Sequence, residues 1–92
     1  MEKIWLSQYD EGVPEFVDVT AYSSISAVFN ESAEKYRDKP AFTNMDKTLT
    51  FGETKQLADQ FSAYLQNVLQ LPKGERIAIM MPNVLQYPIA VF

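Results

Sequence analysis

The sequence predicts an α/β fold, in which helices and strands alternate along the chain. Two amphipathic helical patterns, an apolar run of strand length at residues 76–81, and proline or glycine between these segments support this prediction. The expected order is an irregular arm, a helix, a β-hairpin, a helix, a strand and the start of another helix. Such alternation is typical of domains built around a parallel sheet.

Residues 1–22 are predicted to form an irregular N-terminal arm. Aromatic side chains, acids and a proline are mixed there without a sustained helical or strand period. Trp5 and Leu6 lie in a segment too short to form its own core, so they are candidate interface residues that dock either on the rest of the chain or on a partner. Docking on the same chain is the favoured alternative at this point.

The first helix is predicted to begin near Ser24, a candidate N-cap, and to end before Pro40, which disfavours helical geometry for the preceding residue. Its apolar residues recur at three- and four-residue spacing and share one face: Ile25, Val28, Phe29, Ala33 and Tyr36. The segments "AFTN" and "KTLTF" flank Met45 and Asp46 and are rich in Thr and aromatic residues. This pattern predicts a short hairpin.

The second helix is predicted from a capping box. Thr50 and Glu53 have the spacing at which the Thr hydroxyl accepts from the N3 amide while the Glu carboxylate accepts from the Thr amide. Apolar residues follow at helical spacing to about Leu69, namely Leu57, Ala58, Phe61, Tyr64, Leu65 and Val68. We expect this face to pack in the core.

The run "RIAIMM" is apolar on both faces, which predicts a strand covered on both sides, as in a parallel sheet. Asn83 is a candidate cap for the helix after it, and Pro88 predicts that this helix begins late or with a tight turn. Ligands of open α/β sheets bind beyond the carboxyl ends of strands, so Met81, Pro82 and Asn83 are also a candidate site rim. Plain helix capping is the favoured alternative for this loop.

The composition excludes several classes of function. The net charge is -4, and the eight Lys and Arg residues are scattered, so no nucleic-acid partner is expected. His and Cys are absent, which removes the usual zinc ligands and the Ser-His and Cys-His nucleophile pairs. Gly12, Gly52 and Gly74 are isolated, so no phosphate-cradling loop is expected. We therefore predict no catalytic, cofactor-binding or metal-binding residue in this chain.

The terminal segments carry no targeting pattern. The first residues lack the basic start and apolar run of a secretory signal, and the longest apolar run is far below the ~20 residues of a membrane-spanning helix. An intracellular setting is expected, with any membrane contact peripheral. "NVLQYPIAVF" has an apolar face and no stop signal, so the last helix is expected to be cut near its middle.

Several segments of the chain together resemble a known family. "KIWLSQY", "GVPEF", "KYRDKPAF", "LTFGE" and "KGERIAIMMPN" are similar to the beginning of bacterial long-chain fatty-acid–CoA ligases, which are acyl-CoA synthetases of the adenylate-forming superfamily. The resemblance covers essentially the whole chain. "LTFGE" and "KGERIAIMMPN" would also fit acetyl-CoA synthetases, peptide-synthetase adenylation domains and luciferases, whereas the arm and "NVLQYPIAVF" favour the long-chain fatty acyl branch.

The resemblance implies that residues 23–92 are the start of the large N-terminal domain of a ligase, truncated here and inactive alone. The parent would use ATP and Mg²⁺ to convert a fatty acid to an acyl-adenylate, and coenzyme A would then displace AMP. Some members dimerise through their N-terminal segments, which makes Trp5, Leu6 and Tyr9 candidate dimer contacts. The parents are cytoplasmic and associate peripherally with the inner membrane. An adenylate-forming enzyme for another carboxylic acid and a free-standing interaction module remain the alternatives.

Overall fold

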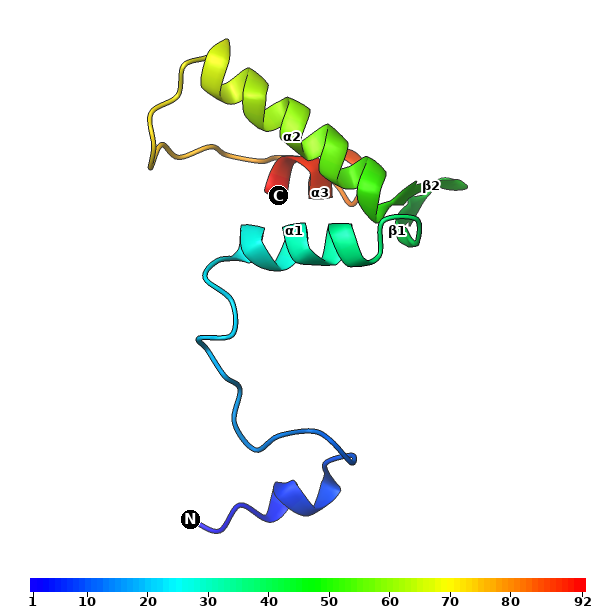
Figure 1. Ribbon diagram of the computed structural model, residues 1–92, viewed down its shortest axis with the longest axis vertical. Coiled ribbons are helices and arrows are strands. Elements are labelled where there is room, and N and C mark those ends of the chain that lie inside the picture. The colour runs from blue at the N-terminus through cyan, green and yellow to red at the C-terminus, as the bar shows by residue number, and fades with distance from the viewer.

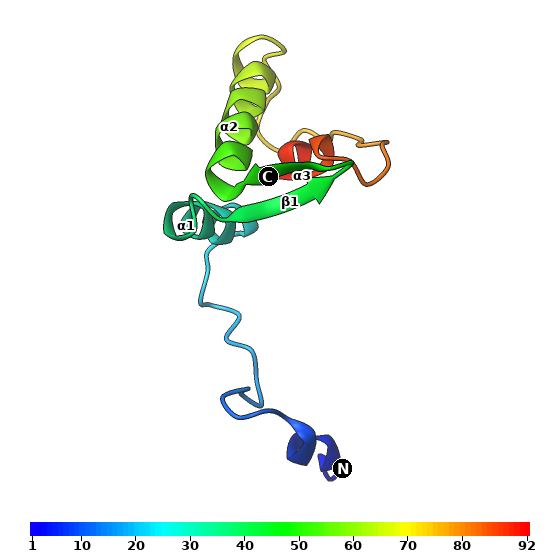
Figure 2. The ribbon, with the colours of Figure 1, turned by 90° about the vertical axis from the view of Figure 1, so that its right-hand side faces the viewer.

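The computed structural model describes residues 1–92 and contains one 3-10 helix, three α-helices and two strands. In chain order these are η1 (Ile4–Gln8), α1 (Ile25–Lys35), β1 (Pro40–Asn44), β2 (Lys47–Thr50), α2 (Phe51–Asn67) and α3 (Gln86–Val91). The three α-helices gather around the hairpin, whereas the arm extends away from them (Figures 1 and 2). The predicted order of helix, hairpin, helix and later helix is confirmed.

Helix α1 begins at the predicted cap. The Ser24 hydroxyl oxygen accepts a hydrogen bond from the Ala27 amide at 3.0 Å, which satisfies one of the free amides of the first turn. Phe29 and Ala33 on the predicted apolar face of α1 are buried, whereas Ile25 at the start of the same stripe is exposed. The apolar stripe of α1 is therefore only partly covered.

Strands β1 and β2 form the predicted hairpin. They pair antiparallel, and a two-residue turn at Met45 and Asp46 joins them. Both turn residues have positive φ angles, 48° and 63°, which is the backbone twist that hairpins of this length favour. The hydroxyl groups of Thr43 and Thr48 are hydrogen bonded across the strands at 2.8 Å. The hairpin therefore closes through its own short-range contacts.

Helix α2 begins with the predicted capping box. The Glu53 amide donates to the Thr50 hydroxyl oxygen at 3.1 Å, and the Thr50 amide donates to the Glu53 carboxylate at 2.9 Å. The Gly52 amide donates to the Arg37 carbonyl oxygen at 2.9 Å, which fixes the start of α2 against the loop after α1. The helix ends at Asn67, slightly before the predicted end. Ala58 is buried as predicted. Tyr64 is about half exposed, so the prediction that it packs in the core is wrong in this structure.

The prediction of a strand at residues 76–81 is wrong in this structure. The segment is extended, but the backbone amides of residues 77–81 make no hydrogen bond, and the hairpin is the only sheet. A parallel strand must pair with a neighbour that the chain reaches by a crossover. The hairpin strands pair with each other and do not supply that neighbour, so the segment has the conformation of a strand without its ladder.

Helix α3 begins late, as predicted from Pro88, but Asn83 does not cap it. The N-cap position is Leu85, whose side chain makes no capping hydrogen bond, and the first helical residue is Gln86. Pro88 is buried within the first turn, where a missing N–H group leaves no intrahelical bond unmade. The ring of Phe92 stacks on Phe29 with centroids 4.3 Å apart, which joins the end of α3 to α1.

The arm folds on itself rather than on the helices. Lys3 forms an ion pair with Glu15, and its ammonium group lies 4.3 Å from the centroid of the Phe16 ring. The short helix η1 makes no contact with α1, α2 or α3, and the arm projects away from them in both views (Figures 1 and 2). Docking of the arm on the rest of the chain, the favoured alternative above, is therefore not formed.

Candidate functional site

The loop at residues 81–84 leads from the extended segment into α3 and borders an open crevice. The crevice lies between β1 and α3 and has a volume of about 400 Å³. Asn83 belongs to its lining, whereas Met81 and Pro82 are exposed to solvent and lie outside it. The lining residues are Phe42, Thr43, Asn44, Asn83, Val84, Tyr87, Pro88, Val91 and Phe92. Of the three candidate rim residues, the structure thus places only Asn83 at a cavity.

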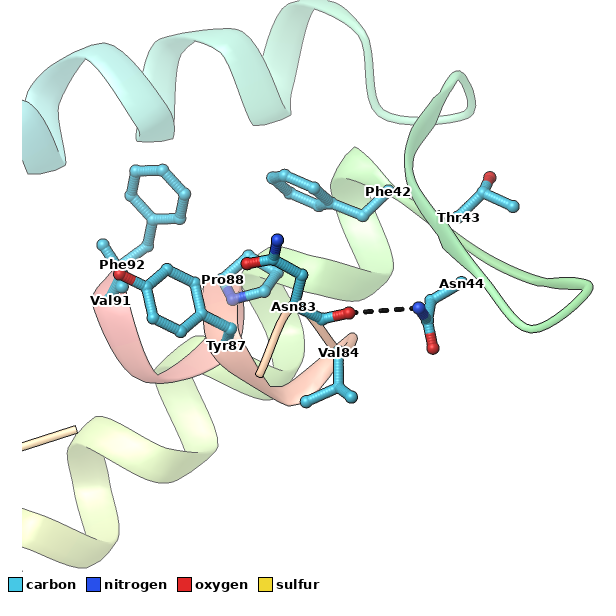
Figure 3. A pocket seen from close by; sticks show the side chains of 9 residues that line it. All are labelled: Phe42, Thr43, Asn44, Asn83, Val84, Tyr87, Pro88, Val91 and Phe92. Carbon is cyan, nitrogen blue, oxygen red and sulfur yellow. Dashed lines mark hydrogen bonds between the residues drawn. The ribbon is translucent and has the colours of Figure 1, made fainter. Parts of the chain in front are cut away.

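A hydrogen bond between distant parts of the chain fixes the geometry of the crevice. The side-chain amide of Asn44, in β1 beside the hairpin turn, donates to the carbonyl oxygen of Asn83 at 3.1 Å (Figure 3). The Asn83 side chain itself makes no hydrogen bond within the protein. The Asn44 side chain therefore positions the loop by binding the backbone carbonyl of Asn83, and the Asn83 side-chain amide remains available.

The crevice has an apolar wall and an uncharged polar edge. Phe42 lies on the side of β1, and Tyr87 and Val91 lie on the side of α3 (Figure 3). None of the nine lining residues carries a charge. Such a surface favours an uncharged apolar group whose polar atoms can pair with the two asparagine side chains.

The residues of this chain do not fit the phosphates of ATP or coenzyme A, or a magnesium ion. The three glycines are isolated, and the Gly52 amide already donates to the Arg37 carbonyl oxygen. No group of three or more His, Cys, Asp or Glu side chains is arranged to hold a metal ion. None of the helices has the length and apolar composition needed to cross a bilayer.

The candidate interface residues lie at the far end of the arm, away from the crevice. Trp5 and Leu6 belong to η1, and Tyr9 is its C-cap residue. The Trp5 and Tyr9 side chains are 46% and 42% exposed, and Leu6 is half-buried. The structure therefore groups these three aromatic and apolar residues in one short element but does not bring them near Asn83.

One carboxyl group of the arm has a shifted pKa. The Thr20 hydroxyl donates to the Asp18 carboxylate at 2.6 Å and the Thr20 amide donates to it at 2.9 Å. These two hydrogen bonds stabilise the ionised form and hold the pKa of Asp18 below its ordinary value of 3.8. Asp18 is fully exposed and shares no contact with the crevice, so the shift reflects a local turn.

Sequence reasoning missed most of the crevice. Phe42, Asn44 and Tyr87 line it, but no sequence pattern singles them out as partners of Asn83. The hairpin pattern placed Asn44 beside a turn, and helical spacing placed Tyr87 on α3. Their proximity follows only from how the hairpin and α3 pack, because Asn44 and Asn83 are 39 positions apart.

Comparison with known proteins identifies the part of the chain that carries the crevice. The model of the AMP-binding enzyme family matches residues 29–92, from the middle of α1 to the residue after α3. The chain belongs to the AMP-binding enzyme family. All residues that line the crevice lie within the part that matches this family, and the arm lies outside it.

Individual members of the AMP-binding enzyme family align with the arm as well. The chain is 49% identical over 92 residues to a long-chain-fatty-acid–CoA ligase of Yersinia pestis and 46% identical to one of Haemophilus influenzae. It is 33% identical to a long-chain-fatty-acid–CoA ligase of Bacillus subtilis over 99% of its length. The chain spans 16% of the length of each of these ligases. No solved structure shows a significant match to the chain.

Proposed function

We propose that this chain is the N-terminal part of an ATP-dependent long-chain fatty-acid–CoA ligase. The carrying observation is 46–49% identity over all 92 residues, arm included, to two bacterial ligases of that name. The whole enzyme would join a fatty acid to ATP, giving an acyl-adenylate and pyrophosphate, and the thiol of coenzyme A would then displace AMP. Residues 1–92 are expected to be inactive alone, since they offer no fit for the nucleotide, coenzyme A or Mg²⁺.

The amount of exposed surface supports the proposal that these residues are part of a larger domain. The chain exposes 8088 Å², whereas a compact monomer of 10.5 kDa exposes about 5,400 Å². Large apolar side chains contribute to the excess, including Ile77 and Met80 of the extended segment. A surface of this kind is expected where further protein covers it.

The arm and the cellular location belong to the same proposal. The exposed Trp5 and Tyr9 side chains, with Leu6 beside them, are suited to a homodimer contact through the arm. The family resemblance supports a cytoplasmic enzyme, peripherally associated with the inner membrane, that uses Mg²⁺ with ATP. Sedimentation of the full-length protein with and without residues 1–22 tests the dimer, and a mass that does not change would contradict it.

Fatty-acid-dependent exchange of pyrophosphate into ATP by the full-length protein tests the proposed reaction. Exchange that depends on Mg²⁺ and rises with acyl-chain length into the long-chain range is the expected result. Acetate and amino acids are the comparison substrates. Exchange with one of those acids and none with fatty acids would assign the protein to another adenylate-forming reaction.

The exposed arm also favours a second candidate, a free-standing interaction module. In that case residues 1–92 made alone would be monodisperse and would unfold in one cooperative transition. The ligase proposal instead expects these residues to associate or to melt without cooperativity, because so much apolar surface is uncovered. A longer reading frame with a phosphate-binding loop would decide for the ligase.

A further inference from the structure

The crevice between β1 and α3 combines two features that a protein segment would satisfy. Its walls are apolar, with Phe42 on one side and Val91 on the other, and its lining carries no charge. An anionic ligand such as a carboxylate or a phosphate would find no cation there, and burying it would be costly. The occupant is therefore an uncharged apolar group.

The Asn83 side chain supplies the second feature. Its carboxamide presents a donor and an acceptor side by side, which is the same pair of groups that one residue of an extended backbone presents. The carbonyl oxygen of Asn83 is already held by Asn44, so the loop is fixed while the side-chain amide stays unpaired. Placed beside an apolar crevice, this amide can pair with a peptide group whose neighbouring side chain enters the crevice.

Three observations indicate that the occupant belongs to the same polypeptide. The chain spans 16% of the length of its ligase relatives, so most of such an enzyme lies outside these residues. Every residue that lines the crevice falls within the family match at residues 29–92. The exposed area also exceeds that of a compact protein of this mass by roughly 2,700 Å². Neither a second copy nor a small ligand accounts for the 84% of the ligase relatives' length that lies outside the match, whereas the rest of the ligase does.

We propose that the crevice is the docking site for an extended segment of the same ligase from outside residues 1–92, which inserts an apolar side chain and pairs its backbone with the Asn83 amide. This inference rests on the proposed function, because it requires the longer enzyme. It goes further by assigning a partner to one surface and a positioning role to Asn44 and Asn83. The docking would hold the hairpin and α3 of this chain against the later part of the enzyme.

Thiol accessibility in the full-length ligase tests the docking. Val91→Cys places a thiol in the crevice, and Glu31→Cys places one on the exposed face of α1, in a background whose native cysteines are replaced. We expect maleimide to label the Val91→Cys thiol at least about 100-fold more slowly in the native enzyme than in urea, because the docked segment must open first. Glu31→Cys controls for the reactivity of an exposed helical thiol.

A second pair of variants tests the role of the amide. Asn83→Leu keeps the size of the side chain but replaces its hydrogen-bonding groups by methyl groups, and Asn67→Leu makes the same change at the exposed end of α2. Asn83→Leu should reduce the protection of the Val91→Cys thiol about tenfold, which is the effect of one lost hydrogen bond. Asn67→Leu should leave the protection unchanged.

The outcomes separate this inference from the proposed function. Fatty-acid-dependent pyrophosphate exchange reads the function, and labelling reads the docking. An active ligase whose Val91→Cys thiol is labelled as fast in the native state as in urea would overturn the docking and leave the function intact. Protection that appears in residues 1–92 alone and rises with protein concentration would assign the crevice to a second copy, and would also overturn it.

Discussion

Phenylalanine side chains have different surroundings in the arm and in the helical body, which consists of α1, the hairpin, α2 and α3. Phe29 in α1 is buried and stacks on Phe92, so most of its apolar surface is removed from water. Phe16 in the arm is 70% exposed, and its ring contacts the Lys3 ammonium group. The difference teaches that the arm is held by a few local polar contacts, whereas the body is held by burial. The stability of the chain should therefore depend on the body.

Replacing each phenylalanine by alanine is the most direct way to break this comparison. Phe29→Ala should lower the free energy of unfolding by about 3 kcal/mol, the lower end of the range for a buried phenylalanine, since the neighbouring crevice lets the site relax. Phe16→Ala should change it by less than about 0.5 kcal/mol, as is usual for an exposed site. Hydrogen exchange of the backbone amides of α1 in the full-length protein measures both changes, because residues 1–92 alone are not expected to unfold in one cooperative transition. Equal losses would show that the arm contributes to the fold.

A substitution at Gly52 tests the close contact between the start of α2 and Arg37 in the loop after α1. A Cβ atom there would lie 2.8 Å from the Cγ atom of Arg37 and 3.1 Å from its carbonyl oxygen. Helix propensity alone predicts that Gly52→Ala stabilises α2 by up to about 1 kcal/mol. The close approach should reverse the sign and lower the free energy of unfolding by about 1 to 2 kcal/mol.

Ser62→Ala, in the middle of the same helix, is the matched control for Gly52→Ala. It removes no close contact with the loop after α1 and loses only an exposed hydrogen bond from the Gln66 side chain, so the free energy of unfolding should change by less than about 0.5 kcal/mol. Hydrogen exchange of the α2 amides in the full-length protein compares the two variants. A stabilising Gly52→Ala substitution would mean that the loop at Arg37 moves aside freely.

The hairpin turn offers a smaller, stabilising change within the body. Met45 has a φ angle of 48°, which is unfavourable for a long side chain, and it is almost fully exposed. Met45→Asn should raise the free energy of unfolding by about 0.5 to 1 kcal/mol, because asparagine tolerates this conformation. Slower hydrogen exchange of the hairpin amides in the full-length protein checks it, with Val17→Asn at an exposed position of the arm as the control that should have no effect.

The elements that sequence predicted are those whose hydrogen bonds close over short distances. The Thr50–Glu53 capping box and the turn at Met45 and Asp46 depend on residues next to one another, so they were readable from the sequence. The strand predicted at residues 76–81 is not formed, because its backbone needs a neighbouring strand for hydrogen bonding and residues 1–92 supply none beside the hairpin. Local pattern is therefore sufficient for the body but not for a central strand.

The same difference between local and long-range contacts applies to the candidate site. The loop at residues 81–83 was placed by its position after an apolar run, and Asn83 does line a crevice. The partner that fixes its carbonyl, Asn44, could not be predicted, since the two residues meet only through packing of the hairpin beside α3. Contacts between residues so far apart in the chain need the assembled structure.

The smallest expected effect concerns the turn that Asp18 forms in the arm. Its pKa lies below the ordinary value of 3.8, because the Thr20 hydroxyl and amide donate to the carboxylate. A group with a lowered pKa stabilises its folded form above the ordinary pKa, and that stabilisation is lost as the pH falls through the lowered value. Above pH 3.8 the turn should be fully formed, and it should open in more acidic solution.

The chemical shift of the Thr20 amide should report the opening of the turn. The Ala27 amide, which donates to the Ser24 hydroxyl oxygen, should not respond. Asp18→Asn should remove the pH dependence at Thr20 and leave the helical body unchanged, as expected if the arm and the body are independent.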